Sequence, residues 1–217
     1  MKTLFLRVGI DRGCGGTLSP LHEDGSFEYV PIPEGSKVND DCYLTYSMLP
    51  AQWGGNLAQY VKRDGIAHYD PEFWTMTYGE PSSPKRDQLL QLQPLDYLVF
   101  YAGFQGPHIE NGVCAVIGFF VVKAVHEIQH EEDKARLTHL RNNAHFRRKK
   151  FEPGLVIVEG EPTQSHLLAK ARIITNGKQL VLPQIEAITG FGGSAKRAVG
   201  RWVKEGHLEK TIGWLVS

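Results

Sequence analysis

Apolar runs along this chain are short, and turn-forming residues separate them. The most regular pattern lies in two neighbouring segments, 96–104 and 114–125, joined by a polar turn that contains glycine and proline. Their aromatic and β-branched residues favour strands, so the pattern predicts a β-hairpin. Alternation along the first strand places Phe100 and Phe104 on one face and Tyr101 on the other.

The rest of the chain alternates short strand-like segments with loops. Further strands are predicted at residues 4–6, 26–30, 151–159, 169–174 and 179–182, and helices at residues 51–64, 127–142 and 194–205. Strands outnumber helices without regular strand–helix–strand alternation, which favours an α+β class with a β-rich barrel or sandwich core and a few peripheral helices. We expect a single domain over residues 1–217, loop-rich up to about residue 80 and barrel-like from about residue 89.

The composition narrows the classes of function. The chain has 217 residues, of which 41% are hydrophobic, and this is enough for a substantial core. Its 24 basic and 24 acidic residues cancel, so any contact with nucleic acid has to be local. Three widely spaced cysteines fit a reducing compartment, and no apolar run is long enough for a membrane span. We therefore expect a soluble, cytoplasmic protein with no membrane contact.

A glycine-rich loop follows the first predicted strand and contains charged residues. Asp11 and Arg12 lie beside the glycines of segment 13–16, and glycine lets a ligand approach the backbone closely. The spacing matches neither a phosphate-binding loop nor a dinucleotide fingerprint, and a tight turn with a surface ion pair is the alternative. The loop contributes Asp11 as a candidate catalytic residue, and Arg7, Arg12 and Ser19 as candidate ligand-binding residues.

A second candidate for chemistry is the pair His68 and Asp70, which precedes Pro71. In an extended segment both side chains point to one face, where the carboxylate orients the imidazole as a general base. The alternative is an aspartate that caps a turn at Pro71. If Asp11 joined the pair, two carboxylates and a histidine would suit a divalent metal ion. We take all three residues as catalytic candidates and assign no metal site and no cofactor from the sequence.

Aromatic and basic residues offer contacts to nucleic acid. Phe100, Tyr101 and Phe104 are candidates to stack a flipped base, with a filled core as the alternative. The strongest positive charge lies in segment 141–150, and its candidate phosphate or ligand contacts are Arg141, His145, Arg147, Arg148 and Lys149. Pairing of these residues with the acidic segment 131–133 is the alternative. A second basic set at helical spacing comprises Lys196, Arg197, Arg201 and Lys204.

Several of these segments carry a family resemblance. The hairpin segments 95–103 and 116–122 resemble the hairpin of PUA-like barrels, including the EVE and ASCH groups. Three further blocks, at residues 11–21, 30–33 and 68–73, precede the hairpin. Taken together, the blocks resemble the nucleotide modification associated domain family, the third of that series, over most of the chain. The resemblance implies a PUA-like core and a setting of DNA modification or phage defence.

Two functions of different classes follow from these residues. The first is a module that binds a modified or flipped base or nucleotide in DNA or RNA, with the hairpin aromatics as its pocket and the basic segment on the backbone. The second is a metal-dependent or acid/base enzyme that acts on a nucleobase or nucleic acid, with Asp11, His68 and Asp70 as its catalytic groups. A protein that binds other proteins and no nucleic acid is the third reading.

Overall fold

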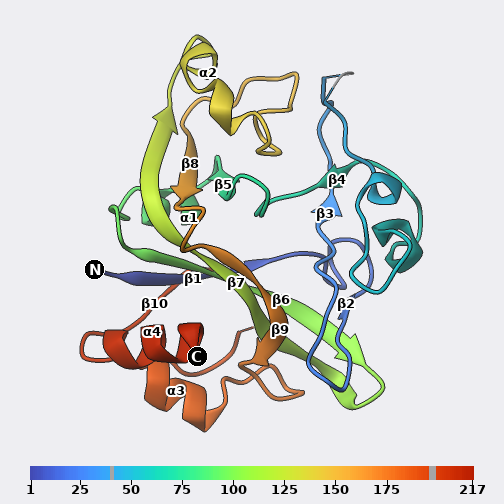
Figure 1. Cartoon of the computed structure of the whole chain (residues 1–217), viewed down its shortest axis with the longest axis vertical. Coiled ribbons are helices and arrows are strands. Elements are labelled where there is room, and N and C mark those ends of the chain that lie inside the picture. The colour runs from blue at the N-terminus through green and yellow to red at the C-terminus, as the bar shows by residue number, and fades with distance from the viewer. Residues whose placement is uncertain (40–41, 196–198) are drawn as a thin grey trace.

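The fold is built on a mixed eight-stranded sheet (Figure 1). The computed structural model describes residues 1–39, 42–195 and 199–217. The main path of the sheet runs through β10 (Arg201–Trp202), β1 (Thr3–Val8), β6 (Tyr97–Gly106), β7 (Ile109–Ile128), β8 (Leu155–Gly160) and β5 (Thr77–Glu80). Beside this path, β2 (Ser19–Pro20) pairs with β6, β9 (His166–Ile173) pairs with β7, and β3 (Ile32–Pro33) pairs with β4 (Ala67–His68) in a separate sheet. The predicted α+β, β-rich class is confirmed.

The helices are short and lie around this sheet (Figure 1). They are α1 (Lys85–Leu89), α2 (Asp133–Arg136), α3 (Pro183–Thr189) and α4 (Leu208–Val216), together with the 3-10 helices η1 (Tyr46–Met48), η2 (Leu57–Tyr60) and η3 (Thr138–Leu140). Figure 1 shows α3 and α4 side by side at one end, and the small β3–β4 sheet beside the main one. Within the described part of the chain, no helix has the length and apolar character to cross a membrane.

The predicted hairpin forms the centre of the main sheet. β6 pairs with β7 along one edge and with β1 along the other, so its backbone is hydrogen-bonded on both sides. β7 has 20 residues and continues past β6 to pair with β8, after a register shift between Val122 and Ala124. The middle of β6 is buried on both faces, which is why its sequence reads as a continuous apolar run.

The two faces of the hairpin pack against different layers. Phe100 and Phe104 join a core cluster that includes Tyr46 of η1, whereas Tyr101 joins a second cluster that includes Leu215 of α4. The predicted alternation is therefore confirmed. All three hairpin aromatics have an exposed fraction of 0%, so the prediction that they stack a base is corrected: their rings fill the core.

Strand pairing replaces two predicted helices. Segment 127–142 first completes β7, because Ile128 pairs with Leu155 of β8, and only then forms α2 and η3. The tail segment 194–205 contains β10, whose Trp202 lies opposite Leu4 of β1. Pairing with an available strand edge outweighs the local preference for helix in both segments. The predicted tail helix with a basic face is therefore wrong for Arg201, which lies in strand β10. Lys196 and Arg197, which belong to the same predicted face, fall outside the described residues.

Other predicted elements are shorter than expected. Segment 51–64 forms only the 3-10 helix η2, where the Asn56 side chain caps the backbone N–H of Ala58. Segments 26–30 and 179–182 form isolated bridges, such as that between Leu21 and Phe27, in place of strands. The first predicted strand and those at 151–159 and 169–174 correspond to β1, β8 and β9.

Phe100→Ala should destabilise the fold, because it removes a ring with no exposed surface from the core. We expect the free energy of unfolding to fall by about 3–5 kcal/mol. Chemical denaturation followed by circular dichroism measures this change. The control is Trp53→Ala, at a side chain that is 53% exposed, and equal stability of the two variants would contradict the core assignment.

Candidate functional site

A polar pocket of about 310 Å³ brings together segments that are far apart in the sequence. We use this name for the cavity whose lining includes Arg7, Asp11, Cys14, His68, Asp70, Glu80, Lys85, His145 and Arg148. All three candidate catalytic residues, Asp11, His68 and Asp70, therefore face one cavity, and two residues of the basic segment join them. The structure supplies the proximity that the sequence could not show, and their catalytic role stays a prediction.

The carboxylate of Asp70 is buried and held by neutral donors. Its Oδ1 accepts a hydrogen bond from Nδ2 of Asn143 at 3.1 Å, and the backbone N–H of Gly79 donates to Oδ2 at 3.0 Å. Burial raises the pKa of Asp70 well above its usual value, despite these hydrogen bonds. Gly79 belongs to β5, and a Cβ there would lie 2.8 Å from the ring of His145, so glycine lets the strand approach the site closely.

Two histidines flank this carboxylate. Nε2 of His68 lies 3.9 Å and Nε2 of His145 lies 3.7 Å from Oδ2 of Asp70. Their rings are nearly perpendicular, at 89°, with centroids 4.7 Å apart. Each Nδ1 contacts a carboxylate on the far side, that of Glu34 at 2.7 Å for His68 and that of Glu152 at 2.8 Å for His145. Burial lowers the pKa of His145 to about 4.

Arg148 forms ion pairs with both carboxylates that contact the Nδ1 atoms of the histidines. Its Nη2 lies 2.9 Å from Oε1 of Glu34, and its Nη1 lies 2.8 Å from Oε1 of Glu152. Burial raises the pKa of Glu34, but hydrogen bonds from His68 and Arg148 outweigh burial and leave that pKa at about 2. The guanidinium therefore pairs with internal carboxylates while it lines the polar pocket, and the predicted phosphate or ligand contact at Arg148 stays a prediction.

His68, Asp70 and His145 also form a group that could hold a metal ion. Each offers one ligand atom, and the three atoms lie within 4.8 Å of one another. Asp11 is not in this group, and its Oδ1 accepts hydrogen bonds from the backbone N–H groups of Gly13 and Cys14. The group of possible metal ligands therefore differs by one residue from the group considered in the sequence analysis, because His145 takes the place of Asp11.

A comparison with protein-family models gives one match. Residues 2–210 match the model described as nucleotide modification associated domain 3. The chain belongs to this family. Comparison with the curated proteins gives no match, and comparison with the solved structures gives none either. The family resemblance is thus confirmed, whereas the PUA-like character of the hairpin stays a prediction.

The other residues that the sequence suggested as ligand contacts lie in different environments in the structure. Arg7 lines the polar pocket, where its Nη1 donates to the carbonyl of Ala195 at 3.3 Å and its Nη2 lies 3.7 Å from Asp11. Arg12 is exposed on the glycine-rich loop. Ser19 has an exposed fraction of 0%, and its Oγ accepts a hydrogen bond from a backbone N–H, which corrects its assignment as a ligand contact.

The basic segment does not act as one strip. His145 and Arg148 turn into the polar pocket, Arg147 is half-buried, and Arg141 and Lys149 are exposed. The exposed members are accessible to the phosphates of a nucleic acid, and the contacts predicted for this segment stay predictions. The predicted pairing of this segment with acidic segment 131–133 is not what the structure shows for Arg148, which uses two other carboxylates.

Sequence reasoning missed the residues that support the site. Glu34 lies far from His68 in the chain, and no local pattern connects the two. Glu152 follows Arg148 by four residues, and Asn143 precedes His145 by two, so this run could have indicated a compact polar cluster. Such spacing is frequent in solvated segments, and only their burial marks these residues as part of a site.

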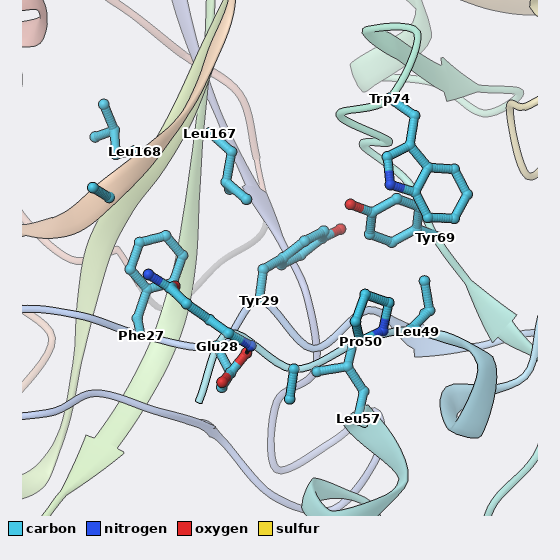
Figure 2. Close-up of a pocket in the computed structure, with 13 residues that line it drawn as sticks. Phe27, Glu28, Tyr29, Leu49, Pro50, Leu57, Tyr69, Trp74, Leu167 and Leu168 are labelled. Atoms are coloured by element: carbon cyan, nitrogen blue, oxygen red, sulfur yellow. Dashed lines mark hydrogen bonds between the residues drawn. The ribbon is translucent and has the colours of Figure 1, made fainter. Parts of the chain in front are cut away.

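A second cavity is lined mainly by aromatic and aliphatic side chains (Figure 2). This aromatic pocket has a volume of about 430 Å³, and its lining includes Phe27, Glu28, Tyr29, Tyr69, Trp74, Leu167 and Leu168. Figure 2 shows Tyr69 and Trp74 close together at one end, and Phe27 and Leu168 at the other. The rings of Tyr69 and Trp74 have centroids 5.0 Å apart, and Trp74 is 51% exposed.

The charge on Glu34 should make stability depend on pH. A carboxyl group whose pKa is lowered from 4.5 to about 2 stabilises the folded state above pH 4.5 and loses that contribution as the pH falls toward 2. Glu34→Gln should therefore cost about 3 kcal/mol of unfolding free energy at pH 7, because it breaks a buried ion pair. We expect this cost to shrink between pH 4.5 and pH 2.

Urea denaturation at several pH values measures the difference between the wild type and Glu34→Gln. The matched control is Glu131→Gln, at an exposed position, which should change stability little at any of these pH values. A cost for Glu34→Gln that stays constant from neutral to acidic pH would contradict the ion-pair assignment.

Proposed function

We propose that the protein is an enzyme that acts on a nucleobase or nucleotide in the polar pocket. Its family is associated with nucleotide modification. The observation that carries the proposal is the convergence of Asp70 with two histidines, all at most 7% exposed, on a cavity that a ligand can occupy. A volume of about 310 Å³ fits the range of small-molecule sites, which begins at about 300 Å³.

The side chains of the pocket support acid/base or metal-dependent chemistry. Imidazole and carboxylate groups are the usual proton-transfer groups and metal ligands of enzymes. Both histidines are oriented by carboxylates, and this is the arrangement that makes an imidazole a positioned base or ligand. Lys85 and Arg7 also line the cavity, where they lie 3.4 Å from Glu80 and 3.7 Å from Asp11, and both can contact an anionic group of a substrate. The implied setting, DNA modification or phage defence in the cytoplasm, belongs to this proposal.

The aromatic pocket favours a second function, the binding of a modified or flipped base. Trp74 is half-exposed at the cavity, and a tryptophan face accepts any base by stacking. Arg141 and Lys149 are exposed and can contact the phosphates of DNA or RNA. This function retains the base-binding module that the sequence suggests and moves its pocket from the hairpin to residues near Tyr69 and Trp74.

A turnover screen tests the enzymatic function. Modified and unmodified DNA, RNA and free nucleotides are incubated with the protein, with and without divalent metal ions, and products are followed by mass spectrometry. His145→Gln should lower turnover by about 100-fold or more, because it removes a group that faces the reacting centre. The matched control is His130→Gln, at an exposed histidine outside the pocket. Equal activity of a folded His145→Gln protein and the control would contradict the proposal.

The binding function has its own test. Trp74→Ala should weaken the binding of a single-stranded oligonucleotide that contains the preferred base by about 1–3 kcal/mol, as expected when one stacked base loses its aromatic partner. Fluorescence anisotropy at a stated salt concentration measures this affinity. Trp53→Ala is the matched control, because Trp53 is 53% exposed and does not line the aromatic pocket. An equal loss in both variants would reject the pocket as the base site.

A further inference from the structure

We propose that His68, Asp70 and His145 bind one divalent first-row transition-metal ion in the polar pocket. One ligand atom of each residue already lies within 4.8 Å of the other two, and the Nε2 atoms of His68 and His145 lie 3.9 Å and 3.7 Å from Oδ2 of Asp70. An ion that binds each atom at about 2.0–2.2 Å would bring them to about 3–3.5 Å from one another, so side-chain movements of up to about 1 Å complete the set. Binding of the ion is independent of the proposed function, whereas its chemical use rests on that function.

The distances within the cluster suit a shared ion better than direct hydrogen bonds. Nε2 of His68 and Nε2 of His145 lie 3.9 Å and 3.7 Å from Oδ2 of Asp70, which exceeds the range of an N–H···O hydrogen bond. Oδ2 instead accepts a hydrogen bond from the backbone of Gly79, on another side. Two imidazole nitrogens thus converge on a carboxylate oxygen that neither of them hydrogen-bonds.

The contacts of the two Nδ1 atoms fix which nitrogen is available as a ligand. Nδ1 of His68 lies 2.7 Å from Glu34, and Nδ1 of His145 lies 2.8 Å from Glu152, whereas the guanidinium nitrogens of Arg148 lie farther from these two atoms, at 3.4 Å and 3.1 Å. We assign the Nδ1 proton of each ring to these shorter contacts with a carboxylate. In a neutral imidazole the other nitrogen, Nε2, then holds a lone pair. The opposite tautomers would place two lone-pair nitrogens against carboxylate oxygens at these short distances.

This carboxylate–histidine arrangement is what metal sites use to orient their ligands. Arg148 reinforces it, because one guanidinium holds both Glu34 and Glu152. Asn143 performs the same task for Asp70, through a hydrogen bond of 3.1 Å to Oδ1 that leaves Oδ2 directed toward the histidines. Each of the three proposed ligands therefore has a partner that fixes its orientation.

Charge balance also favours a cation. Glu34, Asp70 and Glu152 bring three carboxylates to the cluster, and Arg148 contributes one positive charge to them. The carboxylates of the cluster thus outnumber its guanidinium three to one, and a divalent ion would offset this excess.

The donor set indicates the class of metal. Two imidazole nitrogens and one carboxylate oxygen suit zinc, iron(II) and their first-row neighbours, whereas magnesium and calcium prefer oxygen donors alone. Three protein ligands leave coordination positions for water or substrate, as catalytic sites require. When bound, such an ion would polarise a substrate oxygen or activate water.

A second histidine–carboxylate group provides an internal comparison. His126, His139 and Glu159 also bring three ligand atoms within 4.8 Å. There, His139 is exposed, and Lys123 already occupies one oxygen of Glu159 at 2.6 Å. A lysine in contact with the carboxylate supplies positive charge without a metal, so we expect the first cluster to bind the ion more tightly.

Metal binding to the chelator-treated, full-length protein tests the inference. Zn²⁺ affinity is measured by competition with a chromophoric chelator, and Co²⁺ binding by its visible absorption, with Mg²⁺ as the comparison ion. We expect one tightly bound ion per chain. Asp70→Asn and His145→Gln should each weaken binding by roughly 100-fold or more, and Glu152→Gln, which removes only an orienting partner, by roughly 10–100-fold. Circular dichroism establishes that each variant is folded.

His126→Gln is the matched control, because it removes a histidine of the comparison cluster. It should leave the tight site unchanged. The inference is overturned if the wild type binds Zn²⁺ no more tightly than His145→Gln does, or if His126→Gln loses the ion while His145→Gln keeps it. A tightly bound ion without any turnover would reject the proposed function alone, whereas turnover by a protein that binds no metal would reject the ion alone.

Discussion

The antiparallel ladder between β6 and β7 is the constraint on which the rest of the structure depends. The middle of β6 is hydrogen-bonded along both edges and covered on both faces, so it has neither a free edge nor a free surface. The aromatic side chains of this strongly hydrophobic segment are therefore buried in the core, where they stabilise the fold. The functional groups therefore lie outside this strand, and the polar pocket is lined by the end of β1, by the outer strand β5, by the small β3–β4 sheet that carries His68, and by neighbouring segments.

The polar pocket shows how a buried cluster of charges is kept stable. Burial of an isolated charge costs free energy. In this fold Arg148 forms ion pairs with two carboxylates, and each histidine contacts one of these two carboxylates. The partners come from separate parts of the chain, with Glu34 joined to residues more than one hundred positions later. The cluster can therefore form only when the N-terminal loops have packed against the segment after α2, which links the site to completion of the fold.

Sequence patterns predicted the parts of the molecule that depend on local order. Period-two alternation and β-branched residues were sufficient for the hairpin, and the spacing of His68 and Asp70 was sufficient to place both on one face. The tail was misread because the preference for helix is weak compared with the free edge of β1, which only the folded sheet presents. The hairpin aromatics were misread because a strand buried on both faces and a strand that lines a cavity have similar compositions.

The triplet His68, Tyr69 and Asp70, which is closed into a tight turn by a hydrogen bond from the backbone N–H of Asp70 to the carbonyl of His68 at 2.9 Å, separates the two cavities. His68 and Asp70 face the polar pocket, whereas Tyr69 faces the aromatic pocket, and the Tyr29 hydroxyl donates to the carbonyl of Asp70 at 2.7 Å. The backbone of this one triplet therefore forms a wall that both cavities share.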